Sequence, residues 1–128
     1  MYRKMLGREF VDRYLELSRV KDSFLCVGVD PATEDMRDRY TVPQKLIDAK
    51  GELEGLKEFC LNVIEAVTPY APVIKPNAQF LVYALGYEGM KEIAEKIHEG
   101  NSLAILDIKL SDIGSTIDAG LYWIDRLG

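Results

Sequence analysis

Two carboxylates and a lysine stand close together near the end of the chain, where Asp107, Lys109 and Asp112 form an Asp-x-Lys-x-x-Asp pattern. They directly follow the short apolar run of residues 103–106, which is typical of a buried strand. Because alternate side chains of a strand share a face, we expect Asp107 and Lys109 to project the same way. An ammonium group between two carboxylates at the carboxyl end of a parallel strand could handle charge during a reaction.

The same pattern also has a purely structural interpretation. Asp-x-Lys-x-x-Asp is short enough to arise by chance, and Ser111 or Asp112 could simply cap a following helix. Clusters of charged groups mark functional sites only in a statistical sense. Spacing alone therefore leaves a catalytic role and a capping role open.

A longer string around this pattern resembles a known signature. Residues 107–116 read Asp-Ile-Lys-Leu-Ser-Asp-Ile-Gly-Ser-Thr, which is similar to the signature of orotidine 5'-phosphate decarboxylases. Two upstream segments match the same family in order and approximate separation, Leu-Cys-Val-Gly-Val-Asp-Pro at residues 25–31 and Ile-Lys-Pro-Asn at residues 74–77. The second segment resembles the longer, Lys-Pro-Asn-bearing branch of the family, although Leu110 stands where that branch often has arginine.

This resemblance implies an enzyme that converts orotidine monophosphate to uridine monophosphate and CO₂ in pyrimidine nucleotide (UMP) biosynthesis. It implies a network of Lys and Asp charges as the catalytic apparatus, with no metal and no organic cofactor. Lys109 matches the lysine that protonates the pyrimidine carbon, and Asp107 matches the carboxylate beside the departing group. Asp112 matches the second catalytic aspartate, and Lys75 completes the alternating chain of charges.

The resemblance also implies a set of substrate-binding residues and a homodimer. Asp30 and Thr116 match residues that contact the ribose, Asn77 matches a substrate contact of the longer branch, and Ile113 matches an apolar neighbour of the base. In this family the second aspartate reaches across the dimer interface. We therefore expect Asp112 and Thr116 to be shared between two subunits.

Strand and helix patterns alternate along the chain, and no hairpin turn signal separates them. The patterns predict an amphipathic helix (10–17), a strand (24–29), a long polar loop with room for a helical turn (32–51), a helix (53–67), a strand (73–75), a helix (87–97), a strand (103–106) and a last helix from Ile117. Such an alternation builds a parallel sheet with right-handed crossovers.

The fold class implied is α/β, a parallel (β/α) barrel of the TIM type. A complete barrel has eight strand-helix units and about 250 residues, so this 128-residue chain supplies an N-terminal helix, over the bottom of the barrel, and the first three βα units. We expect residues 1–128 to form a single domain. The resemblance implies that this domain is incomplete for activity, because the family's phosphate-binding residues belong to later strands of the barrel. The chain is then truncated or cleaved, or is completed by a complementary C-terminal chain.

Composition excludes several other classes of protein. A net charge of −5 without a basic cluster argues against nucleic acid, and no apolar run is long enough for a membrane span. Cys26 and Cys60 lack metal-ligand spacing and are interpreted as small core residues, while His98 is interpreted as a solvated residue near a helix end. With a charged N-terminus and no secretory signal, the cytoplasm is the expected location.

Two other functions and a structural role remain as alternatives. Magnesium-dependent phosphosugar decarboxylases and aldolases of the same barrel family share the Asp-x-Lys-x-x-Asp core, although the continuation Ile113-x-x-Thr116 favours the nucleotide enzyme. The chain could also be an inactive oligomerising module, or its polar strand ends could only cap helices. A requirement for magnesium would distinguish the first alternative from the cofactor-free decarboxylase.

Overall fold

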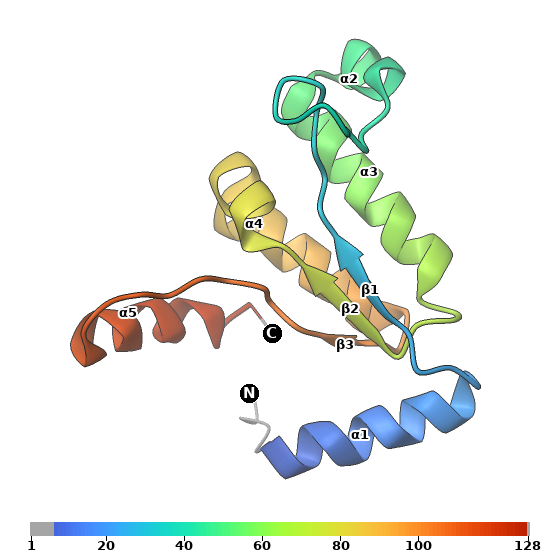
Figure 1. The fold of residues 1–128 in the computed structure, drawn as a ribbon, viewed down its shortest axis with the longest axis vertical. Coiled ribbons are helices and arrows are strands. Elements are labelled where there is room, and N and C mark those ends of the chain that lie inside the picture. Colours follow the sequence, from blue (N-terminus) through green and yellow to red (C-terminus); the bar gives the residue numbers. More distant parts are fainter. Residues whose placement is uncertain (1–6, 128) are drawn as a thin grey trace.

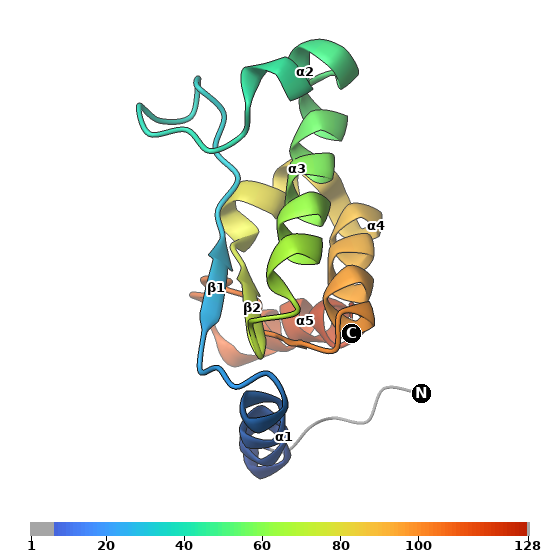
Figure 2. The same ribbon diagram turned by 90° about the vertical axis from the view of Figure 1, so that its right-hand side faces the viewer.

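The computed structural model describes residues 7–127 of the chain and shows a three-stranded parallel sheet in the order β1-β2-β3, with helices between the strands (Figures 1 and 2). The elements are α1 (Gly7–Val20), β1 (Cys26–Val29), α2 (Gln44–Lys50), α3 (Glu52–Val67), β2 (Val73–Pro76), α4 (Ala78–Glu99), β3 (Leu103–Ala104) and α5 (Gly114–Ile124). The alternation of strands and helices and the parallel sheet are therefore confirmed.

The regular part of β3 is shorter than the expected strand, but its pairing with β2 runs further. Three alternate amides donate to β2 and to the residue before it: Leu103 to the Pro72 carbonyl at 2.8 Å, Ile105 to Ile74 at 3.0 Å and Asp107 to Pro76 at 3.0 Å. This even spacing is the hydrogen-bond pattern of a parallel ladder. The third strand therefore stays paired with β2 as far as Asp107.

The two faces of the sheet are covered differently. One face packs Val29 and Ile74 against α3 and α4 in the main core, whose other large members are fully buried: Leu56, Ile64, Leu81, Ile93 and Ile97. On the opposite face, Val73 and Leu103 contact Leu17 of α1. Helix α1 thus closes the amino end of this second face, as Figure 1 shows, and leaves its carboxyl end open.

Two expectations for the first half of the chain are wrong. Strand β1 begins at Cys26 because the two preceding residues make other bonds: the Tyr14 hydroxyl of α1 donates to the Phe24 carbonyl, and the Leu25 amide donates to Ser23 Oγ. Cys26 is exposed rather than a core residue, because it lies with exposed Gly28 on the alternate positions of β1 that face away from the main core, whereas Cys60 is fully buried as expected.

The expected loop of residues 32–51 contains a helix of two turns, α2, because α2 has a partner to pack against. At Gly55 of α3 a Cβ atom would lie only 3.0 Å from the Leu46 carbonyl oxygen, so a glycine is needed for this close approach. Tertiary packing of this kind overrides local propensity.

Helix α4 starts nine residues before the expected helix at residue 87, at Ala78, because the Asn77 side chain accepts a hydrogen bond from the Gln79 amide and caps it. It is kinked at Gly86, whose φ of 62° and ψ of −168° are not helical. Met90 lies in the core, and exposed His98 lies in the last turn, as predicted.

A lysine that the sequence analysis did not single out ties the amino end of the sheet together. Lys21, just after α1, donates to the carbonyls of Thr68 and Gly100, at the ends of α3 and α4, to Ser102 Oγ at 2.7 Å and to the Ala71 carbonyl at 3.3 Å. Burial and the nearby Arg13 lower the pKa of Lys21. Several of the acceptors are carbonyls at helix C-termini, which attract a cation.

We therefore predict that Lys21→Met lowers the free energy of unfolding by about 2 kcal/mol, because oxygens that now bond a charged donor lose it. Urea unfolding followed by circular dichroism measures this difference. The matched control is Lys45→Met on the exposed side of α2, with a change within about 0.5 kcal/mol. Equal effects of the two substitutions would show that the contacts of Lys21 do not stabilise the fold.

Candidate active site

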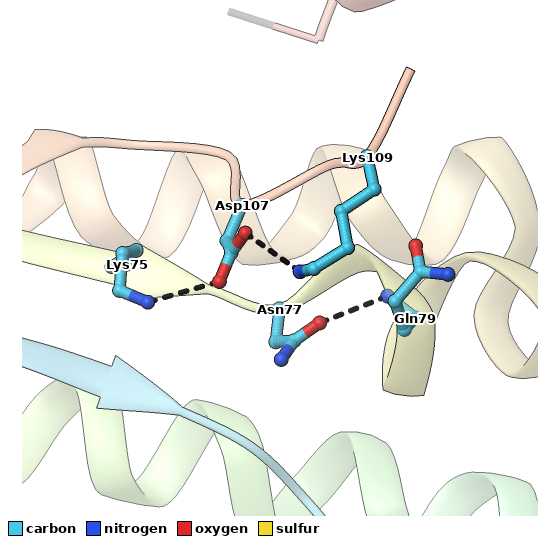
Figure 3. A network of polar contacts seen from close by, with 5 residues as sticks. All are labelled: Lys75, Asn77, Gln79, Asp107 and Lys109. Carbon is cyan, nitrogen blue, oxygen red and sulfur yellow. Dashed lines mark hydrogen bonds and ion pairs between the residues drawn. The ribbon is translucent and has the colours of Figure 1, made fainter. Parts of the chain in front are cut away.

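Three charged side chains meet at the carboxyl ends of the second and third strands (Figure 3). Lys75 Nζ lies 3.0 Å from Asp107 Oδ2, and Lys109 Nζ lies 3.1 Å from Asp107 Oδ1. Asp107 and Lys109 do project the same way, as the strand alternation predicted. However, the arrangement within this chain is one carboxylate between two ammonium groups, and not one ammonium between the carboxylates of Asp107 and Asp112.

The backbone explains why Asp107 lies at the centre of this cluster. Its amide donates to the Pro76 carbonyl at 3.0 Å, and its carbonyl accepts from the Ala78 amide at 3.0 Å. An isolated parallel bridge joins the same residue to Asn77. Asp107 is therefore held on both sides by the end of β2, and its side chain reaches across to Lys75 on that strand.

The charged side chains of this cluster shift the pKa values of Asp107 and Lys75. Hydrogen bonds from Lys75 and Lys109 hold the pKa of Asp107 below its ordinary value. In turn, the hydrogen bond and charge of Asp107 raise the pKa of Lys75, with smaller contributions from Asp30 and Cys26. The ion pair of Asp107 and Lys75 is therefore fully charged at neutral pH.

Asp30 lies on the same face of the sheet. Gly28 is the register partner of Lys75, and a Cβ atom at Gly28 would lie 3.6 Å from Asp30 Oδ2. The carboxylate of Asp30 thus folds back over Gly28, on the side where Lys75 stands. Within residues 7–127 its oxygens accept no hydrogen bond, so they can accept from a ligand.

Asn77 also stands at this edge, at the N-cap of α4. Its Oδ1 accepts from the Gln79 amide at 3.1 Å (Figure 3). That bond fixes the side-chain amide, and Nδ2 makes no hydrogen bond within the described part of the chain. Asn77 can therefore donate to a ligand while it caps the helix.

The other three predicted site residues are not brought to this cluster. Asp112 Oδ1 accepts from the Ile113 amide at 2.7 Å, and no ion pair joins Asp112 to a lysine within residues 7–127. Ile113 is 72% exposed, and Thr116 is exposed in the first turn of α5. Helix α5 begins at Gly114, three residues before the expected start at Ile117, and its N-cap is Ile113 and not Ser111 or Asp112. Figure 1 shows α5 beside the segment that leads away from β3.

A cavity of about 480 Å³ lies on the other side of this segment, between α4 and α5. Leu106 and Ile108 line it together with Val82, Met90 and Trp123. These apolar residues alternate with Asp107 and Lys109 along the chain, so the cavity and the charged cluster occupy opposite faces. None of the predicted site residues lines this cavity.

Two further findings concern the described residues. Between residues 7 and 127 no three His, Cys, Asp or Glu side chains gather as they would around a metal ion. In the same part of the chain, no helix has the length and apolar character needed to cross a membrane.

Comparison with solved structures places this arrangement in a class of fold. The crystal structure of a candidate orotidine 5'-phosphate decarboxylase from Streptomyces avermitilis matches with a TM-score of 0.67 and 25% identity, over 88% of this chain and 37% of that chain. A corresponding structure from Toxoplasma gondii matches with a TM-score of 0.66 and 25% identity, over 85% of this chain and 34% of that chain. The chain therefore has the fold of part of a TIM-type β/α barrel.

The family model described as "Orotidine 5'-phosphate decarboxylase / HUMPS family" matches residues 23–126, and the chain belongs to this family. The curated orotidine 5'-phosphate decarboxylase of Myxococcus xanthus is 30% identical over 112 residues, which are 86% of this chain and 36% of that protein. The same enzyme of Rhodopirellula baltica is 36% identical over 102 residues, 76% of this chain and 33% of the relative. The chain thus spans about a third of the length of these relatives.

The lowered pKa of Asp107 makes a prediction about stability and pH. A carboxyl group with a lower pKa in the folded state stabilises the fold above its unfolded value, here 3.8, and loses that contribution as the pH falls through the folded value. The difference in unfolding free energy between the native chain and Asp107→Asn should therefore be constant around neutral pH and shrink below about pH 4.

Urea unfolding across that pH range measures the difference, with Asp118→Asn as a control at an exposed carboxylate of α5. The control difference should stay small throughout. A difference for Asp107→Asn that grows on acidification would contradict the ion pairs with Lys75 and Lys109.

Proposed function

We propose that the complete protein to which this chain contributes decarboxylates orotidine monophosphate to uridine monophosphate and CO₂. Membership of the family and the curated decarboxylase relatives support the reaction. The observation that carries the proposal is the chain of charges Lys75–Asp107–Lys109 at the carboxyl ends of the strands. Both cysteines are free thiols, which fits a cytoplasmic setting.

In the proposed mechanism Lys109 provides most of the stabilisation of the transition state. Loss of CO₂ leaves a carbanion-like pyrimidine carbon, and Lys109 stabilises that charge and delivers its proton there. Asp107 repels the substrate carboxylate and adds some ground-state strain. Strain alone falls short, because enzymes lower barriers by about 8 to 23 kcal/mol and most of that must come from charge stabilisation.

The remaining predicted residues take the roles that the family resemblance implies. Asp30 and Asn77 have free acceptor and donor atoms beside Lys75, which suits contacts with the ribose and the rest of the substrate. We assign Asp112 and Thr116 to the site of a second subunit of a homodimer and Ile113 to the base. Their exposure, and the lack of an ion pair between Asp112 and a lysine within residues 7–127, support that assignment.

The rest of the barrel is needed for this activity. The chain spans about a third of its curated relatives, and barrel enzymes commonly bind phosphate with the loops after the seventh and eighth strands. The described chain alone is therefore proposed to be inactive, with the later strands provided by the same polypeptide or by a complementary chain.

The competing function is a magnesium-dependent phosphosugar decarboxylase or aldolase. The contacts of Asp107 favour the nucleotide enzyme, because both of its oxygens already pair with ammonium groups. The distinguishing experiment follows the loss of orotate absorbance in the complete protein with excess EDTA. Turnover that persists supports the cofactor-free decarboxylase, and turnover that returns only with added magnesium supports the alternative.

In the complete barrel, Lys109→Ala should reduce kcat by at least about 1,000-fold and change KM little, because the ammonium acts on charge that develops in the transition state. Steady-state kinetics with orotidine monophosphate measures both constants. Lys45→Ala, at an exposed lysine of α2, is the control and should leave both unchanged. A raised KM with an unchanged kcat would make Lys109 a binding residue only.

Sharing of the site across a dimer predicts complementation. A Lys75→Ala barrel mixed with an Asp112→Ala barrel should form heterodimers with one doubly damaged site and one intact site. With random exchange roughly half of the dimers are mixed, so activity should recover to roughly a quarter of the native level. Each parent alone should be nearly inactive.

The matched control mixes Lys75→Ala with Lys109→Ala. Both residues serve their own chain in this scheme, so every site of every dimer carries a lesion and no activity returns. If the Asp112→Ala mixture also stays inactive after proven subunit exchange, Asp112 acts within its own subunit.

A further inference from the structure

The loop after β1 is closed by the side chain of one residue, Thr41. Its hydroxyl donates to the Asp30 carbonyl at 3.0 Å and accepts from the Ala32 amide at 3.0 Å. The Ala32 carbonyl in turn accepts from the amides of Thr41 and Val42. Ala32 and Pro31 are buried, so these bonds form a closed neck at the base of the loop.

This neck determines where the Asp30 carboxylate lies. Asp30 is the first residue after β1, and no hydrogen bond within the described residues holds its own side chain. Its position over Gly28 and beside Lys75 is consequently set by its backbone. Thr41 bonds the peptide groups on both sides of Pro31, namely the Asp30 carbonyl and the Ala32 amide.

A second contact holds the outer part of the loop. The Arg37 guanidinium lies 5.3 Å from the centre of the Phe80 ring in α4, and its Nε donates to the Arg39 carbonyl at 2.8 Å. Together with Thr41, Gly28 and Asp30, Arg37 lines a cavity of about 160 Å³. The loop is thus fixed to α4, whose N-cap is Asn77, one of the predicted substrate contacts.

We propose that Thr41 is a positioning residue that holds Asp30 in place to accept hydrogen bonds from the vicinal hydroxyls of a ribose. This inference rests on the proposed function and assigns a role to a residue that touches no substrate itself. It differs from a general stabilising role, because Thr41 acts on binding only through Asp30.

The first test compares Thr41→Val, which keeps the shape and removes the hydroxyl, with Thr41→Ser, which keeps the hydroxyl. In the complete barrel, Thr41→Val should raise KM for orotidine monophosphate about tenfold with kcat changed less than about twofold, as for lost uniform binding. Thr41→Ser should restore the native KM. The control is Thr33→Val in the same loop, because the buried Thr33 hydroxyl has no hydrogen-bond partner within residues 7–127, and it should leave KM unchanged.

A double-mutant cycle with Asp30→Ala separates positioning from loop stability. If Thr41 acts through Asp30, Thr41→Val should change KM less than about twofold in an Asp30→Ala background. A full tenfold effect in that background would overturn the proposal, as would a native KM in Thr41→Val itself.

A second measurement does not depend on turnover. Lys75 faces Asp107, Asp30 and Cys26, so displacement of Asp30 should lower the pKa of Lys75, which is followed by NMR titration of its side-chain carbon. Thr41→Val should lower it, and Thr41→Ser and Thr33→Val should not. An unchanged Lys75 titration in Thr41→Val overturns the positioning role, whereas absent decarboxylation with a shifted titration overturns only the proposed function.

Discussion

The structure of the site depends on the hydrogen bonds that hold the backbone of Asp107 against the end of β2. The Asp107 amide donates a hydrogen bond to the Pro76 carbonyl, and the Asp107 carbonyl accepts one from the Ala78 amide. These two hydrogen bonds fix Asp107 at the point where β2 ends and α4 begins. Because Asn77 between them caps that helix, the same few residues end the strand, start the helix and aim the carboxylate at Lys75. A shift of one residue in this pairing would turn the Asp107 side chain to the opposite face.

Most of this arrangement could be predicted from the sequence, because it follows from local patterns. A short apolar run followed by charge at each of Asp30, Lys75 and Asp107 predicts polar groups at neighbouring strand ends, and the parallel order gathers them at one edge. Which carboxylate pairs with the lysines was not predictable from spacing. That depends on the course of the chain after Lys109, where Ser111 and Asp112 are candidate helix caps in the sequence but the N-cap of α5 is Ile113.

The errors in the predicted helices also have physical causes. Helix α2 depends on the close approach of Gly55 to the Leu46 backbone, a contact specific to the folded chain. The early start of α4 depends on a local signal that was not used, the asparagine at position 77 as an N-cap. The role of Lys21 was missed because its acceptors are backbone carbonyls far away in sequence. Every residue has a backbone carbonyl, so the sequence does not indicate which carbonyls will accept a hydrogen bond from a lysine.

The exposure of the charged cluster gives a physical reason for the proposal that this chain needs the rest of the barrel for activity. The Lys109 side chain is 66% exposed and that of Asp107 is 29% exposed, so water screens the charges that must act on the substrate. One face of the sheet is covered by α3 and α4, while the other is covered only at its amino end by α1. The later strands, and in the proposed dimer the second subunit, would cover the open face. Exclusion of water there would strengthen every electrostatic interaction of Lys109, so in the proposed enzyme closure of the barrel and catalysis would depend on the same surface.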